Sequence, residues 1–395
     1  MGNESSIRTL QVVSALGMGG AETWLMELLR HWSRSGEATI DFLATSGDAG
    51  LFDDEARSLG ANVHYIRYSR ANLWRFRDGF RRVLRREKYD AIHDHQDYAS
   101  GWHFLLGGSD LPPVRVTHVH NVAYQIRSNY GVTYARRLTA RVGRRLVARY
   151  ATYITGTSRQ VITEYGFDDS CFSNIPKAAL HCGFDPKRFL GDPVAQKESV
   201  CREFGWSRDV KIIIFAGRMD RSPDVGHPQN NKNSGLAVSI GIECARLDPG
   251  ACLLFVGEPS PALPVLQARI AAAGLADRIR FVGVRSDVER LMLGSDVLLF
   301  PSRGEGLGMV AVEAQAAGLP VVASTAVPRE CVVVPDLVRF MPIEEGAERW
   351  AEILLHEMER PRNIAAPNRA VAASPFSISR SARRLAQVYS GARLS

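Results

Sequence analysis

The feature that constrains this chain most is an alternation of short apolar runs with longer amphipathic segments, present in both halves. The apolar runs are nearly continuous in hydrophobicity, as expected for strands of a parallel sheet whose two faces are both covered. Such alternation predicts a doubly wound α/β fold, and its recurrence predicts two domains of this kind. The expected strands are 10–15, 39–45, 62–66, 90–95, 114–119 and 152–156 in the first half, and 210–217, 251–257, 278–283, 296–301 and 319–324 in the second.

The length of 395 residues also favours two domains, because a single core rarely grows that large. The segment 175–189 carries two prolines and a glycine and interrupts the alternation, so the boundary is expected there. We therefore predict an N-terminal domain over 1–180 and a C-terminal domain over 181–375. The remaining segment, 376–395, is predicted to be a basic amphipathic helix that packs back on the N-terminal domain.

Composition limits the partners and the compartment. The formal net charge of +7 favours anionic partners, namely nucleotide phosphates, a phospholipid surface or nucleic acid. No nucleic-acid-binding module is recognisable, so we expect no nucleic acid. The six cysteines form no C-x-x-C pair, which favours reduced thiols over a disulfide framework or a zinc site. Without an apolar stretch of about eighteen residues, the chain is expected to be cytoplasmic.

The first glycine-rich turn follows the first expected strand and spans Gly17–Glu22. Glycines at Gly19 and Gly20 would let the backbone approach a phosphate where the next helix begins. A dinucleotide fingerprint requires a third glycine at the position of Glu22, so a dinucleotide-dependent oxidoreductase is disfavoured. A glycine turn with no ligand remains an equal alternative.

The second glycine-rich turn lies between the expected strand 296–301 and a helix that begins near Met309. It places Glu305 in the loop, Gly306 and Gly308 beside it, and Glu313 about one turn into the helix. The positive end of this helix suits a diphosphate, and carboxylates accept hydrogen bonds from sugar hydroxyls. The alternative is a turn whose acidic residues only cap the helix.

These residues resemble a known family. Glu305 and Glu313 after Phe300-Pro-Ser match the E-x7-E signature of the retaining glycosyltransferases of family four, which have the GT-B fold. Further matching elements run in the same order from about 8 to 340: Gly19-Gly20-Ala-Glu22, Ile92-His-Asp-His95, His118-Val-His120-Asn121, Gly183-Phe-Asp185 to Phe189, and Gly217-Arg218 with Lys232-Asn233. The linker departs from the pattern at His181-Cys-Gly, and the spacer Met219–Asn231 is longer than usual.

The resemblance implies a role for each matching residue. Arg218 and Lys232 would bind the donor diphosphate, and two cations opposite a helix N-terminus can stabilise pyrophosphate as it leaves. Glu313 would hold the ribose. The donor sugar would contact Glu305 with Gly306, Leu307 and Gly308, the nucleobase would lie near Arg285, and Gly19 and Gly20 would complete the donor contacts. His120 is expected nearest the reacting centre, while His93, His95 and His118 keep structural roles.

The expected activity is retaining transfer of a hexosyl group from a nucleotide-diphosphate sugar, with UDP as the expected nucleotide, to a saccharide or lipid-linked acceptor. The acceptor would bind the N-terminal domain and the donor the C-terminal domain, with a cleft between them. The absence of a D-x-D sequence predicts a metal-independent reaction, and no other cofactor is implied. The alternatives are a nucleotide-sugar epimerase of GT-B fold and a catalytically inactive GT-B binding protein.

The segment 134–150 is unusually rich in arginine. On a helix, Tyr134, Leu138, Val142, Leu146 and Tyr150 form one stripe, and an arginine stripe lies beside it. The arginines expected to meet a membrane are Arg137, Arg141, Arg144, Arg145 and Arg149. Such a face can rest on an anionic membrane, which predicts peripheral contact with the inner face of the membrane. The alternative, slightly favoured, buries the apolar stripe in the core and leaves the arginines in solvent.

Overall fold

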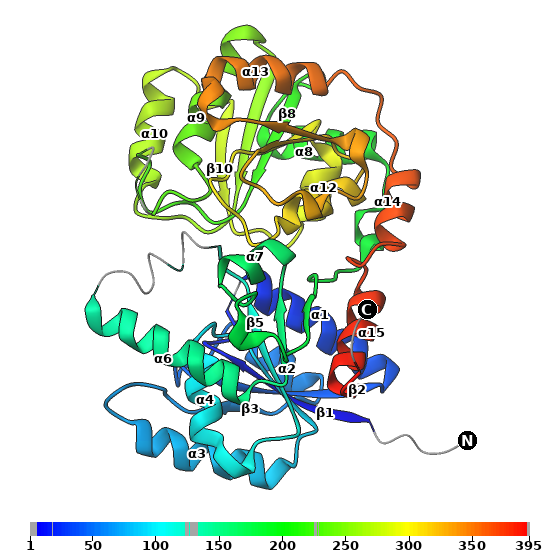
Figure 1. The fold of residues 1–395 in the computed structure, drawn as a ribbon. Coiled ribbons are helices and arrows are strands. Elements are labelled where there is room, and N and C mark those ends of the chain that lie inside the picture. Colours follow the sequence, from blue (N-terminus) through cyan, green and yellow to red (C-terminus); the bar gives the residue numbers. More distant parts are fainter. Residues whose placement is uncertain are drawn as a thin grey trace. The chain divides into compact units, whose positions relative to one another are not determined.

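The computed structural model describes residues 6–17, 19–122, 126, 133–224, 227 and 229–392. The chain forms two compact units. Unit 1 comprises Met1–Phe184 and Pro375–Ser395, and unit 2 comprises Asp185–Ser374. Each unit is a doubly wound α/β domain of its own, drawn in blue to green with red for unit 1, and in green to red for unit 2 (Figure 1).

Unit 1 is built on a parallel sheet of seven strands in its described part, in the order β3-β2-β1-β4-β5-β6-β7. The central strands are buried on both faces, which explains their continuous hydrophobicity. The strands are β1 (Ile7–Val13), β2 (Ala38–Ala44), β3 (Val63–Tyr65), β4 (Ala91–Asp94), β5 (Val114–Val119), β6 (Tyr153–Gly156) and β7 (Lys177–Ala179). The short edge strand β7 was not predicted from the sequence.

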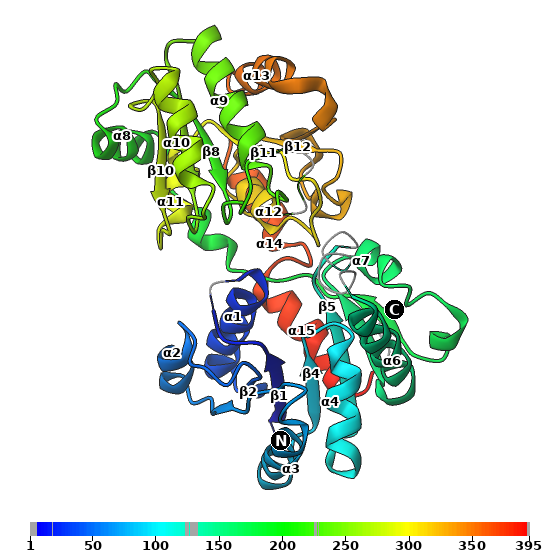
Figure 2. The same cartoon turned by 90° about the vertical axis from the view of Figure 1, so that its left-hand side faces the viewer.

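The helices of unit 1 cover both faces of its sheet. Right-handed crossovers place α1 and α2 on one face and α3, α4, α6 and α7 on the other. Their bounds are α1 (Gly20–Ser35), α2 (Asp53–Ser58), α3 (Leu73–Glu87), α4 (Ala99–Gly107), α6 (Tyr134–Tyr150) and α7 (Arg159–Glu164). Figure 2 shows α4 and α6 side by side.

Two glycines allow that close contact between α4 and α6. A Cβ atom on Gly101 would lie 2.3 Å from the carbonyl oxygen of Gly143, and one on Gly143 would lie 2.4 Å from that of Tyr98. The buried face of α6 is accordingly Ala140, Gly143 and Val147. The predicted burial of the stripe that begins at Tyr134 is therefore wrong for the first half of the helix.

The C-terminal helix α15 (Ile378–Tyr389) belongs to unit 1 and packs on α1 and β1. Its Ser381 hydroxyl accepts a hydrogen bond of 3.0 Å from the indole nitrogen of Trp24. The incoming segment is fixed where Phe184 donates to Phe376 at 2.9 Å and accepts from Ile378 at 2.8 Å. The two units divide at Phe184, four residues beyond the expected boundary.

Unit 2 repeats the architecture with six parallel strands, in the order β10-β9-β8-β11-β12-β13. The strands are β8 (Lys211–Ala216), β9 (Ala251–Val256), β10 (Ile279–Gly283), β11 (Val297–Phe300), β12 (Val321–Ser324) and β13 (Val338–Met341). The helices are α8 (Pro193–Phe204), α9 (Ser234–Leu247), α10 (Leu263–Ala272), α11 (Val288–Gly294), α12 (Met309–Ala316), α13 (Gly346–Glu357) and α14 (Ala365–Ala372). The prediction of two doubly wound parallel sheets is confirmed.

Candidate functional site

In unit 2 the chemically interesting residues gather where β8 and β11 lie next to each other. Successive strands are added on one side of β8, ending at β10, and on the opposite side of β11, ending at β13. The direction of the strand order therefore changes between β8 and β11, which pair with each other. The carboxyl ends of strands at such a switch point are where open α/β sheets bind their ligands. The loops that follow β8 and β11 are therefore the natural place to look for a donor site.

The loop after β11 is shaped by Gly308, the residue that precedes α12. Its φ angle is 90°, and a Cβ atom there would lie 3.0 Å from both Phe300 and Val327, so only glycine fits well. Leu307 is buried beside it. The turn leaves Glu305 in the loop and Glu313 half-buried on α12, with Gly306 between Glu305 and the buried Leu307.

Glu305 forms an ion pair with Lys232, whose Nζ lies 2.7 Å from its Oε1. The side chains of Lys232 and Glu305 are 26% and 11% exposed, so this pair is largely shielded from water. The lysine stem lies against Gly217, just after β8, and its Nζ is 5.6 Å from the centre of the Phe300 ring. Lys232 and Glu305, which were predicted from different motifs, are thus in direct contact.

Asp220 holds Lys232 in position, and no sequence motif pointed to this residue. One carboxylate oxygen of Asp220 accepts hydrogen bonds from the backbone N–H of Asn231 at 2.7 Å and of Lys232 at 2.8 Å. The other accepts from the N–H of Ser234 at 2.9 Å and from its hydroxyl at 3.0 Å. This buried carboxylate closes the long spacer that separates Lys232 from the strand end.

The two predicted arginines differ in their environment. Arg218 is exposed directly after β8, at the same edge of the sheet as Lys232. Arg285 is held by both carboxylate oxygens of Asp287, at 2.8 and 3.0 Å, and by Glu203 at 2.8 Å. Hydrogen bonding to Asp287 raises the pKa of Arg285. With its guanidinium used in these pairs, the geometry does not support a donor contact by the Arg285 side chain.

In unit 1 the predicted glycine turn is occupied by a side chain of the protein itself. Gly19 precedes α1, and a Cβ atom there would lie 2.2 Å from a carboxylate oxygen of Glu22. Gly20 has open space where its Cβ would be. Burial raises the pKa of Glu22. A phosphate at Gly19 would meet this carboxyl group, so the geometry disfavours Gly19 as a phosphate contact.

The switch point of unit 1 lies between β1 and β4, and histidines from β4 and β5 gather beside it. The rings of His118 and His120 stack at 4.2 Å, and those of His93 and His118 stack at 5.1 Å. His95 lies 5.1 Å from His120. Desolvation lowers the pKa of all four rings, and that of His120 falls to about 4.

Three of these histidines also lie close enough to hold a metal ion. Ring nitrogens of His93, His95 and His118 lie within 4.8 Å of one another, the one such group among the described residues. However, both nitrogens of His93 and both of His95 already have hydrogen-bond partners on the protein. The nitrogens of His93 and His95 are therefore engaged in the hydrogen-bonded stack of rings and are not available to a metal.

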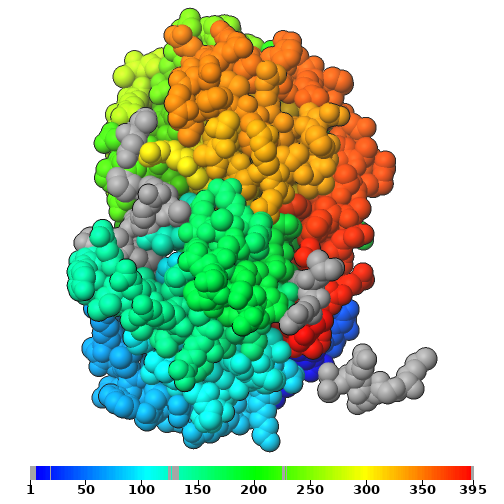
Figure 3. All heavy atoms as spheres, in the orientation of Figure 1, coloured from blue at the N-terminus to red at the C-terminus, as the bar shows by residue number. Residues whose placement is uncertain are grey.

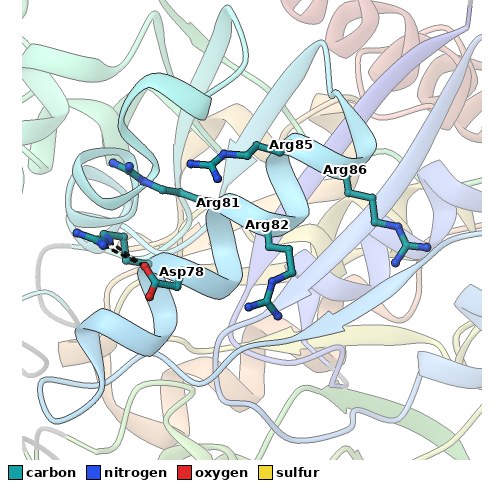
Figure 4. Close-up of a pocket in the computed structure, with 6 residues that line it drawn as sticks. Asp78, Arg81, Arg82, Arg85 and Arg86 are labelled. Atoms are coloured by element: carbon teal, nitrogen blue, oxygen red, sulfur yellow. Dashed lines mark hydrogen bonds and ion pairs between the residues drawn. The ribbon is translucent and has the colours of Figure 1, made fainter.

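A second surface of unit 1 is strongly basic. Arg81, Arg82, Arg85 and Arg86 project from α3 around a surface pocket of about 650 Å³, with Asp78 at one end (Figure 4). Helix α6 also reaches the molecular surface, as its cyan-green atoms show (Figure 3). Of the five arginines in the stripe predicted on α6, Arg144 is bound to Asp169 and to the carbonyl of Gly166, so it does not belong to a free basic face.

Large apolar side chains are exposed on the same two helices. Trp74 at the start of α3 is 72% exposed, and Tyr134 and Leu138 at the start of α6 are 83% and 48% exposed. The side chain of Arg70, just before α3, donates to Thr139 of α6 at 2.8 Å, so the beginnings of these helices are neighbours. Within the described residues, no helix is both long enough and apolar enough to cross a bilayer.

Two models of glycosyltransferase families match the chain, one in each unit. "Glycosyltransferase Family 4" matches residues 18–176, and "Glycosyl transferases group 1" matches residues 211–356. EpsF of Bacillus subtilis (strain 168), which is named as a glycosyltransferase, is 28% identical over 358 residues, covering 89% of this chain and 88% of EpsF. The D-inositol 3-phosphate glycosyltransferase of Jonesia denitrificans is 27% identical over 278 residues, covering 67% of this chain and 62% of that protein.

Solved structures show the same fold at lower sequence identity. Alr3699/HepE of Anabaena, crystallised in complex with UDP, superposes with a TM-score of 0.77 at 19% identity, covering 98% of this chain and 100% of HepE. WaaG, a glycosyltransferase involved in lipopolysaccharide biosynthesis, gives a TM-score of 0.69 at 15% identity, covering 97% and 100%. The paired family matches and this fold identify the chain as a glycosyltransferase of the family-four type with the GT-B fold.

Proposed function

We propose that this glycosyltransferase moves a hexosyl group from a UDP-sugar to a saccharide or lipid-linked acceptor with retention of anomeric configuration. The observation that carries the proposal is the Lys232–Glu305 pair at the switch point of unit 2. It places a cation for the diphosphate and a carboxylate for sugar hydroxyls side by side. Unit 2 would bind the donor, and unit 1 would bind the acceptor and supply His120.

Each donor contact follows from charge and position. Lys232 and Arg218 would neutralise the diphosphate together with the N-terminus of α12, where backbone N–H groups carry partial positive charge. Glu313 would hold the ribose, and Glu305 with Gly306, Leu307 and Gly308 would hold the sugar. Because Glu305 neutralises Lys232 in the structure described here, donor binding would replace one anionic partner of the lysine by another.

The same cations would serve the chemical step. As the bond to the anomeric carbon breaks, negative charge grows on the diphosphate, and fixed cations stabilise it without needing to reorganise. In a front-face substitution the departing phosphate would accept the proton of the incoming hydroxyl, so no protein nucleophile is required. Neither a metal nor another cofactor enters this scheme.

UDP is the proposed nucleotide because the fold neighbour HepE was crystallised with UDP and with UDP-glucose. Thermal unfolding in the presence of UDP, GDP, ADP and TDP would test the choice. A ligand present at about a hundred times its dissociation constant adds about 2.7 kcal/mol to the free energy of unfolding. We expect UDP to raise the unfolding temperature most. Equal shifts with all four nucleotides, or no shift with any, would contradict the donor assignment.

We further propose that α3 and α6 dock unit 1 on the anionic inner face of a membrane, where a lipid-linked acceptor would lie. Exposed apolar side chains next to arginines match the chemistry of a bilayer interface, in which rings insert and cations meet phosphate headgroups. The surface consists of Trp74, Tyr134 and Leu138 with Arg75, Arg82, Arg137, Arg141, Arg145 and Arg149. Arg85 and Arg86 lie on the same helix as Arg82 but form ion pairs with Asp110 and Glu87.

Co-sedimentation with vesicles of phosphatidylglycerol and phosphatidylcholine would test this surface. Binding should weaken with salt, because headgroup attraction is screened. The double variant Arg82→Glu/Arg141→Glu should bind less than the double variant Arg202→Glu/Arg269→Glu, which makes the same charge change on α8 and α10 of unit 2. Equal binding by the two variants would remove the proposed surface.

A further inference from the structure

The four stacked histidines of unit 1 belong to a hydrogen-bond network with a fixed direction. That direction is set by the backbone carbonyl of Thr39, which can only accept. The Thr9 hydroxyl donates to it at 3.0 Å, and therefore accepts from the side-chain amide of Gln11 at 3.2 Å. The amide nitrogen of Gln11 also donates to the Tyr389 hydroxyl at 2.8 Å. The orientation of the Gln11 amide is thereby determined.

The oxygen of Gln11 then fixes the protons on two histidines. It can only accept, so His95 carries its proton on Nε2, which lies 3.0 Å away. The Nδ1 atom of a neutral His95 is an acceptor, and it lies 2.9 Å from Nε2 of His120. His120 therefore donates from Nε2, and its Nδ1 carries the lone pair.

The Tyr389 hydroxyl fixes the other two rings. It accepts from Gln11, so its own proton is donated to Nδ1 of His93 at 2.7 Å. His93 is then protonated on Nε2, which donates to Nδ1 of His118 at 3.0 Å. The remaining proton of His118 is on Nε2, a buried atom with no hydrogen-bond partner in the described structure. The centroids of the Trp24 and His118 rings lie 5.5 Å apart, with an angle of 66° between the ring planes.

We propose that Gln11 is a positioning residue that, through His95, fixes His120 as a neutral imidazole whose Nδ1, which has no hydrogen-bond partner among the described residues, accepts a hydrogen bond from a substrate hydroxyl. The proposal rests on the role given to His120 in the proposed function. In this arrangement His120 orients a hydroxyl and carries no charge. The low pKa of His120 agrees with a neutral ring at physiological pH.

A neutral acceptor suits the proposed reaction. Positive charge develops at the anomeric carbon as the sugar leaves the diphosphate, so a nearby imidazolium would oppose it, whereas a lone pair would not. Stacking four rings without charge also avoids repulsion among them. The last helix of the chain contributes Tyr389 to the branch of this network that runs through His93 and ends at His118.

Long-range ¹H–¹⁵N correlation spectra of protein labelled with ¹⁵N-histidine report the tautomer of each ring directly, without donor or acceptor. The four signals can be assigned from single His→Gln variants. In the wild type at pH 7.5 we expect all four rings to be neutral and protonated on Nε2. A His120 ring protonated on Nδ1, or on both nitrogens, would overturn the proposal. This measurement is independent of any transferase activity.

Two substitutions separate the branches of the network. Gln11→Met keeps the side-chain length but removes the oxygen that accepts from His95, so His95 and His120 should become mixtures of tautomers. The turnover number kcat should fall about three- to ten-fold, which corresponds to the free energy of one neutral hydrogen bond. Tyr389→Phe should alter His93 and His118 while His120 and kcat remain unchanged. UDP affinity should stay at the wild-type value in both variants. If the His120 ring in Gln11→Met kept the wild-type tautomer, the proposal would be overturned. If that variant does not fold, the tautomers in the wild type and in Tyr389→Phe still test the proposal.

Discussion

Replacing Asp220 by asparagine should destabilise unit 2 and weaken nucleotide binding together. The two carboxylate oxygens each accept two hydrogen bonds, from Asn231 and Lys232 on one side and from Ser234 on the other. An asparagine amide keeps only one oxygen. Turned toward Asn231 and Lys232, its NH2 group faces two N–H donors. Turned toward Ser234, it faces one N–H donor and a hydroxyl that can rotate to accept, so one or two charge-assisted hydrogen bonds are lost.

The expected size of the effect follows from that count. Each lost hydrogen bond to a charged group is worth about 1.5–3 kcal/mol, so the loss of one or two gives about 1.5–6 kcal/mol. A domain of about 150–250 residues loses about 2–4 °C of unfolding temperature per kcal/mol, so the decrease should be about 3–24 °C. The nucleotide should also bind less tightly, because a neutral amide holds the backbone N–H of Lys232 less firmly than a carboxylate does.

Differential scanning calorimetry measures the first effect, and UDP titration well below the unfolding temperature measures the second. Asp224→Asn is the matched control, since it makes the same change in the same loop at an exposed carboxylate. It should leave the unfolding temperature near that of the wild type. If Asp220→Asn unfolded within about 2 °C of the wild type, the reasoning that this carboxylate builds the donor loop would be refuted.

Three further predictions follow from the two sites. Glu313→Gln should mainly weaken nucleotide affinity, by about ten- to a hundred-fold. Glu305→Gln should depress turnover more than it weakens UDP binding, because UDP lacks the sugar. UDP titration and initial rates measure both effects, and a loss of UDP affinity in Glu305→Gln but not in Glu313→Gln would mean that the two roles are exchanged. EDTA should leave turnover largely intact, and loss restored by added Mg²⁺ or Mn²⁺ would contradict a metal-independent step. Because the stacked histidines have lowered pKa values, the unfolded chain binds more protons than the folded chain below about pH 6.5. The free energy of unfolding should therefore fall on acidification, by up to about 1.4 kcal/mol per pH unit for each ring. Urea unfolding at pH 7.5 and 5.5 measures this difference, and equal free energies at the two pH values would argue against neutral rings.

The sequence predicted the central strands of both sheets but missed an edge strand in each. Strands such as β1 and β11 are buried on both faces, so their continuous apolar runs stand out. By contrast, β7 is three residues of lysine and alanine, and β13 carries an exposed Arg339. β7 and β13 each pair with only one neighbouring strand, so fewer contacts constrain their side chains and their hydrophobic pattern is weaker. Local pattern therefore found the central strands and the edge strands β3 and β10, but not β7 and β13.

The candidate donor site was predictable where a glycine turn or a motif that resembles family four marked it. Gly308 needs a positive φ angle, and its place between a strand and a helix pointed to Glu305 and Glu313. Asp220 was not predictable, because its partners are backbone N–H groups brought together by the fold. For Arg285 the sequence showed one acidic partner, Asp287, but not the other, because Glu203 is distant in the sequence. Likewise, the direction of the histidine network depends on Tyr389, far away along the chain.

Transfer of a labelled sugar tests the central claim most directly. Wild-type protein and Lys232→Ala would be incubated in EDTA with UDP-glucose, UDP-galactose, UDP-N-acetylglucosamine or GDP-mannose, using membrane lipids and oligosaccharides as acceptors. We expect one UDP-sugar to pass its label to an acceptor with retained configuration and with release of an equal amount of UDP. Lys232→Ala should transfer about ten- to a hundred-fold more slowly. If the folded wild type released no nucleotide from any donor, or if Lys232→Ala transferred at the wild-type rate, the assignment of the donor site would be contradicted.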